Sequence, residues 1–307
     1  GKSVCINAIV SCLIMEKSPA EMRLLLIDPK RVELTPYNGV PHLLTPVVVD
    51  TDKVVGLLKG LIQEMLDRYR RMEEVRVRNI EAYNKKMPEK MPLLVVAVDE
   101  LADLMMSAAF DIEQSLCRLA QLGRATGIHL IVATQRPSVD VVTGLIKANF
   151  PSRVSFGVTS QVDSRTILDT AGADKLLGRG DMLYLPLDAS KPVRAQSVFI
   201  SDREIEGLVS FWMTTPRAAV PSVQLRPAED VQTEGENAGQ EDDVRDELLD
   251  KAIELAHTYS KLSTSLMQRR LRIGYPRAAR LMDQLEEQGI VGPSDGSKSR
   301  DVIMNRA

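Results

Sequence analysis

Short apolar runs alternate with helix-like stretches from residue 1 to about residue 214 of this 307-residue chain. The runs are five or six residues long and lie at 22–27, 93–98, 128–133 and 154–158. Runs that are apolar on both faces are typical of strands that helices cover on both sides. Strand–helix alternation therefore predicts an α/β fold with a mostly parallel sheet.

The stretches between these runs predict helices, and further elements complete a first domain. Gly127 follows one predicted helix directly, as glycine commonly does at a helix end. Two later runs predict antiparallel strands, and a closing helix ends near residue 214. The predicted helices are 51–86, 111–126, 139–148 and 202–213, and the additional strands are 182–185 and 193–200. We therefore place the first domain at 1–214.

The composition changes after this domain. Residues 215–243 carry prolines, glycines and many acidic residues but few apolar ones, which predicts a flexible, solvated linker. Residues 244–307 predict three short helices and a two-stranded hairpin, with Pro276 at the start of the third helix. This order is typical of a small winged-helix domain.

The chain starts with Gly1-Lys2-Ser3, and an apolar, helix-like stretch follows from Val4. These residues match the end of the phosphate-binding loop G-x-x-x-x-G-K-[ST]. In that interpretation Lys2 contacts the phosphates of ATP, Ser3 ligates Mg²⁺, and the helix points its amino end at the anion. The alternative is an exposed tripeptide at a chain end. We also expect the first five loop positions to be missing, so that this stretch alone binds nucleotide poorly.

The run 93–98 ends in two adjacent carboxylates, Asp99 and Glu100. At the end of a buried strand, Asp99 can hold the hydration shell of Mg²⁺, and Glu100 can orient or deprotonate the attacking water. The pair can also begin a solvated helix, which Gly-Lys-Ser upstream makes the weaker interpretation. Gln135, after the run 128–133, is a candidate sensor of the γ-phosphate or an ordinary strand-to-loop residue.

Arginines in or near the downstream loops are candidates for stabilising phosphate charge from a neighbouring subunit. Arg165 is our candidate among Arg136, Arg153, Arg165 and Arg179, although the sequence does not single one out. The three cysteines are isolated, which excludes a disulfide or zinc framework, and no metal besides Mg²⁺ is predicted.

The net charge of −3 means that any nucleic-acid binding must be local. Residues 261–280 carry six lysines and arginines and no acidic residue. On the predicted third helix, Arg280 can contact guanine and Asp283 can accept from cytosine, while other cations contact phosphates. The alternative is a helical module that binds protein. The candidate DNA contacts are Arg269, Arg270, Arg272, Arg277, Arg280, Asp283, Lys298 and Arg300.

Longer motifs carry a resemblance to a known family. They include LIDPK at 26–30, VDELADLM at 98–105, ATQRPSVDV at 133–141, LLGRGDML at 176–183 and RIGYPRAAR at 272–280. With these motifs the chain resembles the C-terminal motor and γ domain of the FtsK/SpoIIIE family of bacterial DNA translocases.

The resemblance implies a RecA-like P-loop ATPase core that hydrolyses ATP with Mg²⁺. It implies a homo-hexameric ring that pumps double-stranded DNA in chromosome segregation during cell division or sporulation. The γ domain of the family reads short oriented sequences and in some members activates a tyrosine recombinase. The resemblance also implies a cytoplasmic domain of a protein anchored in the bacterial inner membrane by a segment outside this chain.

Two other functions stay open at this stage. One is a DNA-binding regulator that does not hydrolyse ATP, and the other is a protein-secretion ATPase with a related motor. Pro276 stands where a polar base-contacting residue is expected, so the DNA sequence that is read also stays open.

Overall fold

The computed structural model describes residues 1–215, 223, 225, 249–271, 278, 281–282, 284–286, 288–292 and 299–303. The chain divides into two compact units, Gly1–Thr233 and Glu234–Ala307.

A three-stranded parallel sheet forms the centre of the first unit. Its order is β1 (Met22–Ile27), β2 (Leu93–Val98) and β3 (Ile128–Val132). In the register Leu25 lies opposite Val96, and Val96 lies opposite Leu130. The first three predicted strands and their parallel pairing are therefore confirmed.

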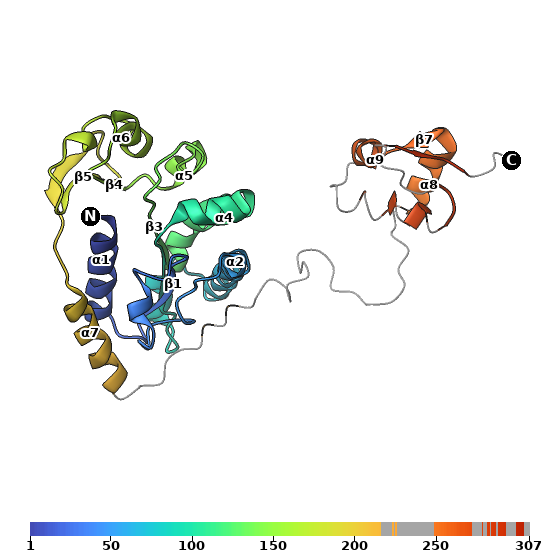
Figure 1. The fold of residues 1–307 in the computed structure, drawn as a ribbon. Helices are drawn as coiled ribbons and strands as arrows, with labels where there is room; N and C mark the ends of the chain where they lie inside the picture. Colours follow the sequence, from blue (N-terminus) through green and yellow to red (C-terminus); the bar gives the residue numbers. More distant parts are fainter. Residues whose placement is uncertain are drawn as a thin grey trace. The chain divides into compact units, whose positions relative to one another are not determined.

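Helices cover both faces of this sheet (Figure 1). Helices α1 (Lys2–Glu16) and α7 (Asp202–Thr214) pack on one face, and α2 (Thr51–Glu74) and α4 (Leu101–Thr126) pack on the other. Successive strand residues serve the two faces alternately, because side chains in a strand have a period of two. In β1, Leu24 and Leu26 belong to the α1 cluster, while Leu25 and Ile27 belong to the α2–α4 cluster.

A second sheet follows, and here one prediction is wrong. Strands β4 (Arg153–Phe156), β5 (Asp181–Leu185) and β6 (Val193–Gln196) pair antiparallel. The run 154–158 was expected to behave like the three buried runs, but Val154 is 39% exposed and β4 has one buried residue. The smaller elements of this unit are η1 (Thr35–Tyr37), α3 (Ile80–Lys86), α5 (Gly144–Asn149), α6 (Gln161–Leu168) and η2 (Ala173–Lys175).

Two helix boundaries also differ from the prediction. The expected helix 51–86 is two helices, because the chain leaves helical geometry between Glu74 and Ile80. Helix α4 begins ten residues before the expected position 111, with Glu100 as its N-cap residue. Ala108 inside α4 has non-helical angles (φ −152°, ψ 59°), so the helix is kinked there.

The second unit is a small helical unit with a two-stranded ladder. Helices α8 (Leu249–Thr258) and α9 (Thr264–Leu271) flank β7 (Lys261–Leu262), which pairs antiparallel with β8 (Arg300–Asp301). A buried apolar cluster that includes Leu262 holds these elements together. The winged-helix assignment stays a prediction, because residues 272–277 and 293–298 lie outside the described residues.

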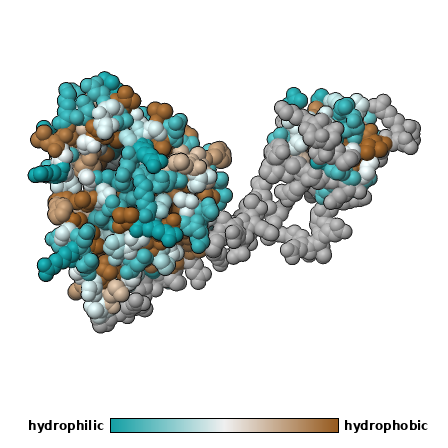
Figure 2. Space-filling model, viewed as in Figure 1, coloured by the Kyte–Doolittle hydropathy of each residue, from teal (hydrophilic) through white to brown (hydrophobic). Residues whose placement is uncertain are grey.

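The predicted linker also falls mainly outside the described residues. Val223 and Leu225, which are described, pack against the α2–α4 cluster of the first unit. On the face that Figure 2 shows, hydrophilic side chains predominate in the first unit and apolar ones lie in separate patches. Within the part of the chain that the structure describes, no helix combines the length and apolarity needed to cross a membrane.

Gly127→Ala is expected to lower the free energy of unfolding by about 1–3 kcal/mol. Gly127 caps α4 with φ +76°, and an added Cβ would lie 2.7 Å from Ile80 Cδ1 and 2.9 Å from Leu93 Cδ2. Gly144 is a matched control, because its Cβ would meet nothing within 4 Å. Urea unfolding should show Gly144→Ala within about 0.5 kcal/mol of the wild type. Equal losses in both variants would contradict this assignment of strain to Gly127.

Candidate functional site

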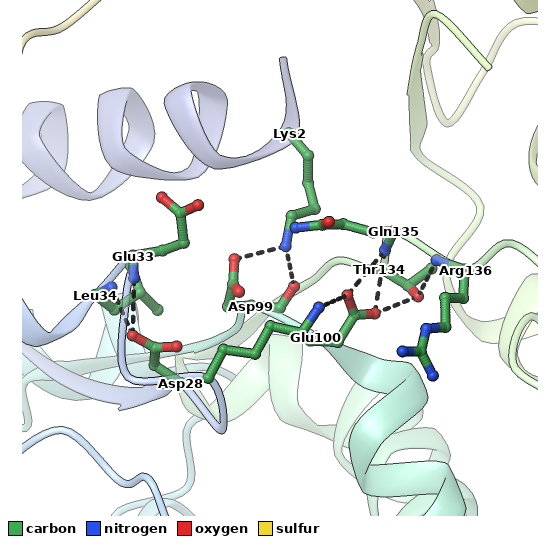
Figure 3. Close-up of polar contacts among 10 residues, drawn as sticks. Lys2, Asp28, Glu33, Leu34, Asp99, Glu100, Thr134, Gln135 and Arg136 are labelled. Atoms are coloured by element: carbon green, nitrogen blue, oxygen red, sulfur yellow. Dashed lines mark hydrogen bonds and ion pairs between the residues drawn. The ribbon is translucent and has the colours of Figure 1, made fainter. Parts of the chain in front are cut away.

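Polar side chains from four elements meet at the carboxyl edge of the parallel sheet (Figure 3). Asp28 follows β1, Asp99 and Glu100 follow β2, Gln135 follows β3 closely, and Lys2 begins α1. The carboxyl ends of parallel strands are where open α/β folds bind ligands. The structure thus brings Lys2, Asp99, Glu100 and Gln135 to one edge.

Lys2 and Asp99 form the central contact of this edge. Lys2 Nζ lies 2.7 Å from Asp99 Oδ1 and donates to the Asp99 carbonyl oxygen at 2.6 Å. The Asp99 side chain is fully buried, and 16% of the Lys2 side chain is exposed. The ammonium is therefore held at the end of β2 by both the carboxylate and the backbone.

The Asp99 carboxylate is only half satisfied. Burial raises the pKa of Asp99, and the Lys2 ammonium offsets part of that rise. Within the described residues, its buried Oδ2 has no hydrogen-bond partner. Buried polar atoms are normally paired, so a free buried carboxylate oxygen fits an added cation or its water shell. Mg²⁺ in nucleotide sites uses few protein ligands and several waters, which suits this donor set.

Glu100 accepts hydrogen bonds on both carboxylate oxygens. Oε1 accepts from Thr134 Oγ1 at 2.5 Å and Oε2 accepts from Lys30 Nζ at 2.9 Å. The Gln135 amide is shared between them, at 3.1 Å from Oε1 and 3.2 Å from Oε2. Burial acts to raise the pKa of Glu100, but the donors on Thr134, Lys30 and Gln135 outweigh it and lower the pKa. The carboxylate is therefore held in its charged form.

Asp28 organises the loop that carries Lys30. Its fully buried Oδ2 accepts from the backbone amides of Glu33 at 3.0 Å and Leu34 at 2.9 Å. These bonds close the chain after β1 into a compact loop, residues 28–34. The loop ends where Leu34 enters the α1 cluster.

Lys30 and Thr134 also contact Glu100, and neither was predicted from the sequence to have a role in the site. Lys30 lies in the LIDPK motif, three residues after the end of β1. Thr134 lies two residues after the end of β3. The rule that singled out Asp99 and Glu100, polar residues just after a buried strand, would also have found them.

A cavity of about 860 Å³ adjoins this edge. Gly1, Lys2, Ser3 and Gln135 line it, whereas Val4 does not. The Gln135 side chain points toward Lys2 (Figure 3). The far wall comes from β4, where the Phe156 ring packs so closely on Gly1 that an added Cβ would lie 2.6 Å from it.

The structure does not bring Arg165 to this site. Arg165 is exposed on α6 and is not among the residues that line the cavity. Arg153 does line the cavity, but it donates to Asp169 at 2.7 Å and to the Ile167 carbonyl at 2.9 Å.

Three candidate DNA contacts in the second unit are described. Arg269 and Arg270 are exposed on α9, and Arg270 donates to the Tyr259 hydroxyl at 2.7 Å. Arg300 is mostly buried and pairs with Glu286 at 2.6 Å, which indicates a structural contact. The other five candidates, Arg272, Arg277, Arg280, Asp283 and Lys298, lie outside the described residues.

Comparisons with known families match both units. A model described as the FtsK/SpoIIIE family matches residues 1–139, and a model described as the FtsK gamma domain matches residues 243–305.

Curated relatives match the chain throughout its length. It is 52% identical to the DNA translocase SpoIIIE of Bacillus subtilis, over 100% of this chain and 39% of that protein. It is 51% identical to the DNA translocase FtsK of Halalkalibacterium halodurans, over 99% of this chain and 39% of that protein. The chain thus spans about two fifths of the length of these relatives.

Solved structures share the fold of the first unit. The pCW3 conjugation coupling protein TcpA with ATPγS is 28% identical with a TM-score of 0.61, over 69% of this chain and 61% of that one. The type VII secretion ATPase EccC of Thermomonospora curvata is 21% identical with a TM-score of 0.63, over 73% and 27%. These likenesses show that the first unit has the α/β fold of ATPase motor domains.

Proposed function

The chain belongs to the FtsK/SpoIIIE family, and from this premise we propose that it is the motor and γ part of an ATP-driven translocase of double-stranded DNA. The observation that carries the proposal is the contact of Lys2 with Asp99, beside Glu100, at the carboxyl edge of the sheet. At that edge Lys2 offers a cation that can bind phosphate. Asp99 offers a carboxylate oxygen that has no hydrogen-bond partner among the described residues, and Glu100 offers a second carboxylate that can bind water.

Each residue of the edge has a proposed part in hydrolysis. Lys2 leaves Asp99 for the phosphates of ATP, and Asp99 together with Ser3 holds the metal. Bound Mg²⁺ would neutralise charge that develops on the phosphates. Glu100 orients the attacking water and accepts its proton, and Gln135, close to Lys2, senses the γ-phosphate.

Family membership supports the finer parts of the proposal. We propose a homo-hexameric ring on duplex DNA that acts in chromosome segregation at division or sporulation. The γ unit reads oriented sequences, with Arg269 and Arg270 near the phosphates, and a tyrosine recombinase is a candidate partner.

A membrane anchor outside these residues would hold the motor on the cytoplasmic side of the inner membrane. An arginine in trans completes the site, with Arg165, exposed on α6, as the candidate.

The gamma-domain match favours DNA over protein as the substrate. Secretion ATPases share the motor fold, but the relatives at about half identity carry the name DNA translocase. The same names, together with the paired Lys2 and Asp99, favour a motor over a DNA-binding regulator without hydrolysis.

Duplex DNA is expected to stimulate ATP hydrolysis by the full-length protein, and the stimulation should fall as salt rises. The salt dependence follows because phosphate contacts release counterions. Steady-state phosphate release with duplex DNA, and without it, at several salt concentrations measures both effects. A hydrolysis rate that ignores DNA at every salt concentration would contradict the translocase proposal.

A further inference from the structure

The donors on Glu100 differ in how firmly they are anchored. The Gln135 amide belongs to the backbone, and Thr134 lies just after β3, which is hydrogen-bonded to β2. These two donors move only if the strand moves. Lys30 reaches the same carboxylate from loop 28–34 through a flexible side chain that is 34% exposed.

The contact with Lys30 occupies the oxygen that water activation needs. The Gln135 amide is shared between the two oxygens, at 3.1 Å from Oε1 and 3.2 Å from Oε2, and Oε1 also accepts from Thr134 Oγ1 at 2.5 Å. Without Lys30, whose Nζ lies 2.9 Å from Oε2, this oxygen would accept only from the shared amide and would have room for a water. A general base must lie within hydrogen-bond reach of the proton that it takes. While the Lys30 ammonium is bound to Oε2, it competes with the attacking water for this oxygen.

Asp103 is a second carboxylate that can pair with Lys30. It is the third residue of α4, three positions after the N-cap residue Glu100, and it is half-buried. Like Glu100, whose effect is larger, its carboxylate raises the pKa of Lys30. In the described part of the chain, its side chain forms no ion pair or hydrogen bond. Lys30 can therefore exchange one carboxylate for the other without leaving the loop, since the side chains of the N-cap residue and of the third helical residue lie close together at a helix start.

Loop 28–34 is anchored at both ends, whereas its middle residues, which include Lys30, are exposed. Asp28 is fully buried and bonded to the amides of Glu33 and Leu34, so both ends of loop 28–34 are held. Between these ends Lys30, Arg31 and Val32 are exposed. A contact on the loop can then move Lys30 without disturbing β1.

We propose that Lys30 is a positioning residue that restrains Glu100 in the resting motor, and that its ammonium transfers to Asp103 when hydrolysis proceeds. The proposal rests on the proposed ATPase function of this site. It assigns the loop after β1 a part in controlling when water is activated.

Lys30→Gln in the full-length protein tests the restraint. Glutamine keeps a polar side chain without the charge, so we expect the basal ATP turnover to rise about three- to tenfold, the range for the typical net contribution of one hydrogen bond. The rate with duplex DNA should change less, so the ratio of stimulated to basal rate falls. Lys30→Arg should keep the wild-type ratio. Lys53→Gln is the control, because Lys53 is an exposed lysine in the first turn of α2, where it pairs with the N-cap residue Asp50.

The possible outcomes separate the restraint from the motor itself. An unchanged basal rate in Lys30→Gln, or basal and stimulated rates that fall together, would overturn the restraint. Asp103→Asn is a second variant, which should lower the DNA-stimulated rate, and no change there would overturn the transfer. Absence of DNA stimulation in the wild type would count against the translocase proposal alone, because the basal comparison needs no DNA.

Discussion

Lys2→Ala in the full-length protein is expected to lower ATP turnover about 100- to 1,000-fold, the range for losing one preorganised donor to the charge that develops in the reaction. The phosphates lose their cation, and the fully buried Asp99 also loses the ammonium 2.7 Å from its Oδ1. Because burial already raises the pKa of Asp99, removal of Lys2 should raise it further and weaken metal binding. Steady-state hydrolysis and titration with a fluorescent ATP analogue measure the two effects.

Lys59→Ala is the matched control for that variant. Lys59 also pairs with an aspartate, Asp111, at 3.3 Å, but both side chains are about half exposed. Exposed ion pairs contribute little, so turnover and nucleotide affinity should stay at the wild-type level. If the Lys2 and Lys59 variants behaved alike, the assignment of Lys2 to phosphate would be wrong.

Glu100→Gln is expected to lower turnover about 100- to 10,000-fold while ATP still binds. The amide has the shape of the carboxylate but cannot accept the proton from water. It also places an N–H₂ group among the donors of Lys30, Thr134 and Gln135, so a modest loss of thermal stability should accompany the loss of turnover. Single-turnover hydrolysis beside an ATP-binding titration separates binding from chemistry.

Glu113→Gln provides the comparison on the same helix. Glu113 accepts a hydrogen bond from the Thr143 hydroxyl and is not among the residues that line the cavity. Its substitution should leave turnover unchanged. Wild-type hydrolysis in Glu100→Gln would mean that water is activated by another group.

The meeting of Lys2 with Asp99 was predictable from sequence because of how parallel sheets are built. A residue that follows a buried strand must lie at the carboxyl edge, and so must a residue that begins the helix after the phosphate loop. The partner of Lys30 was harder to predict, because Glu100 lies 70 residues away and no local spacing links the two. Only the pairing of β1 with β2 brings their ends together.

The strand β4 shows the limit of reading apolar runs. A short run with exposed positions and a fully buried one can have the same composition, and neither reveals the direction in which it pairs. The kink at Ala108 was equally hidden, since alanine favours helices and the angles there depend on packing.

The sheet separates the two halves of the proposed chemistry. Lys2 sits on α1, which is fastened to one side of β1 and β2, and Glu100 begins α4, which is fastened to the opposite side of the same two strands. A conservative substitution of a buried α1 residue, for example Val10, should change nucleotide affinity and leave proton transfer unchanged. A conservative substitution of a buried α4 residue, for example Leu116, should change proton transfer and leave nucleotide affinity unchanged. If the proposed roles of Lys2 and Glu100 hold, interior substitutions far from either group should change ATP binding and ATP cleavage separately.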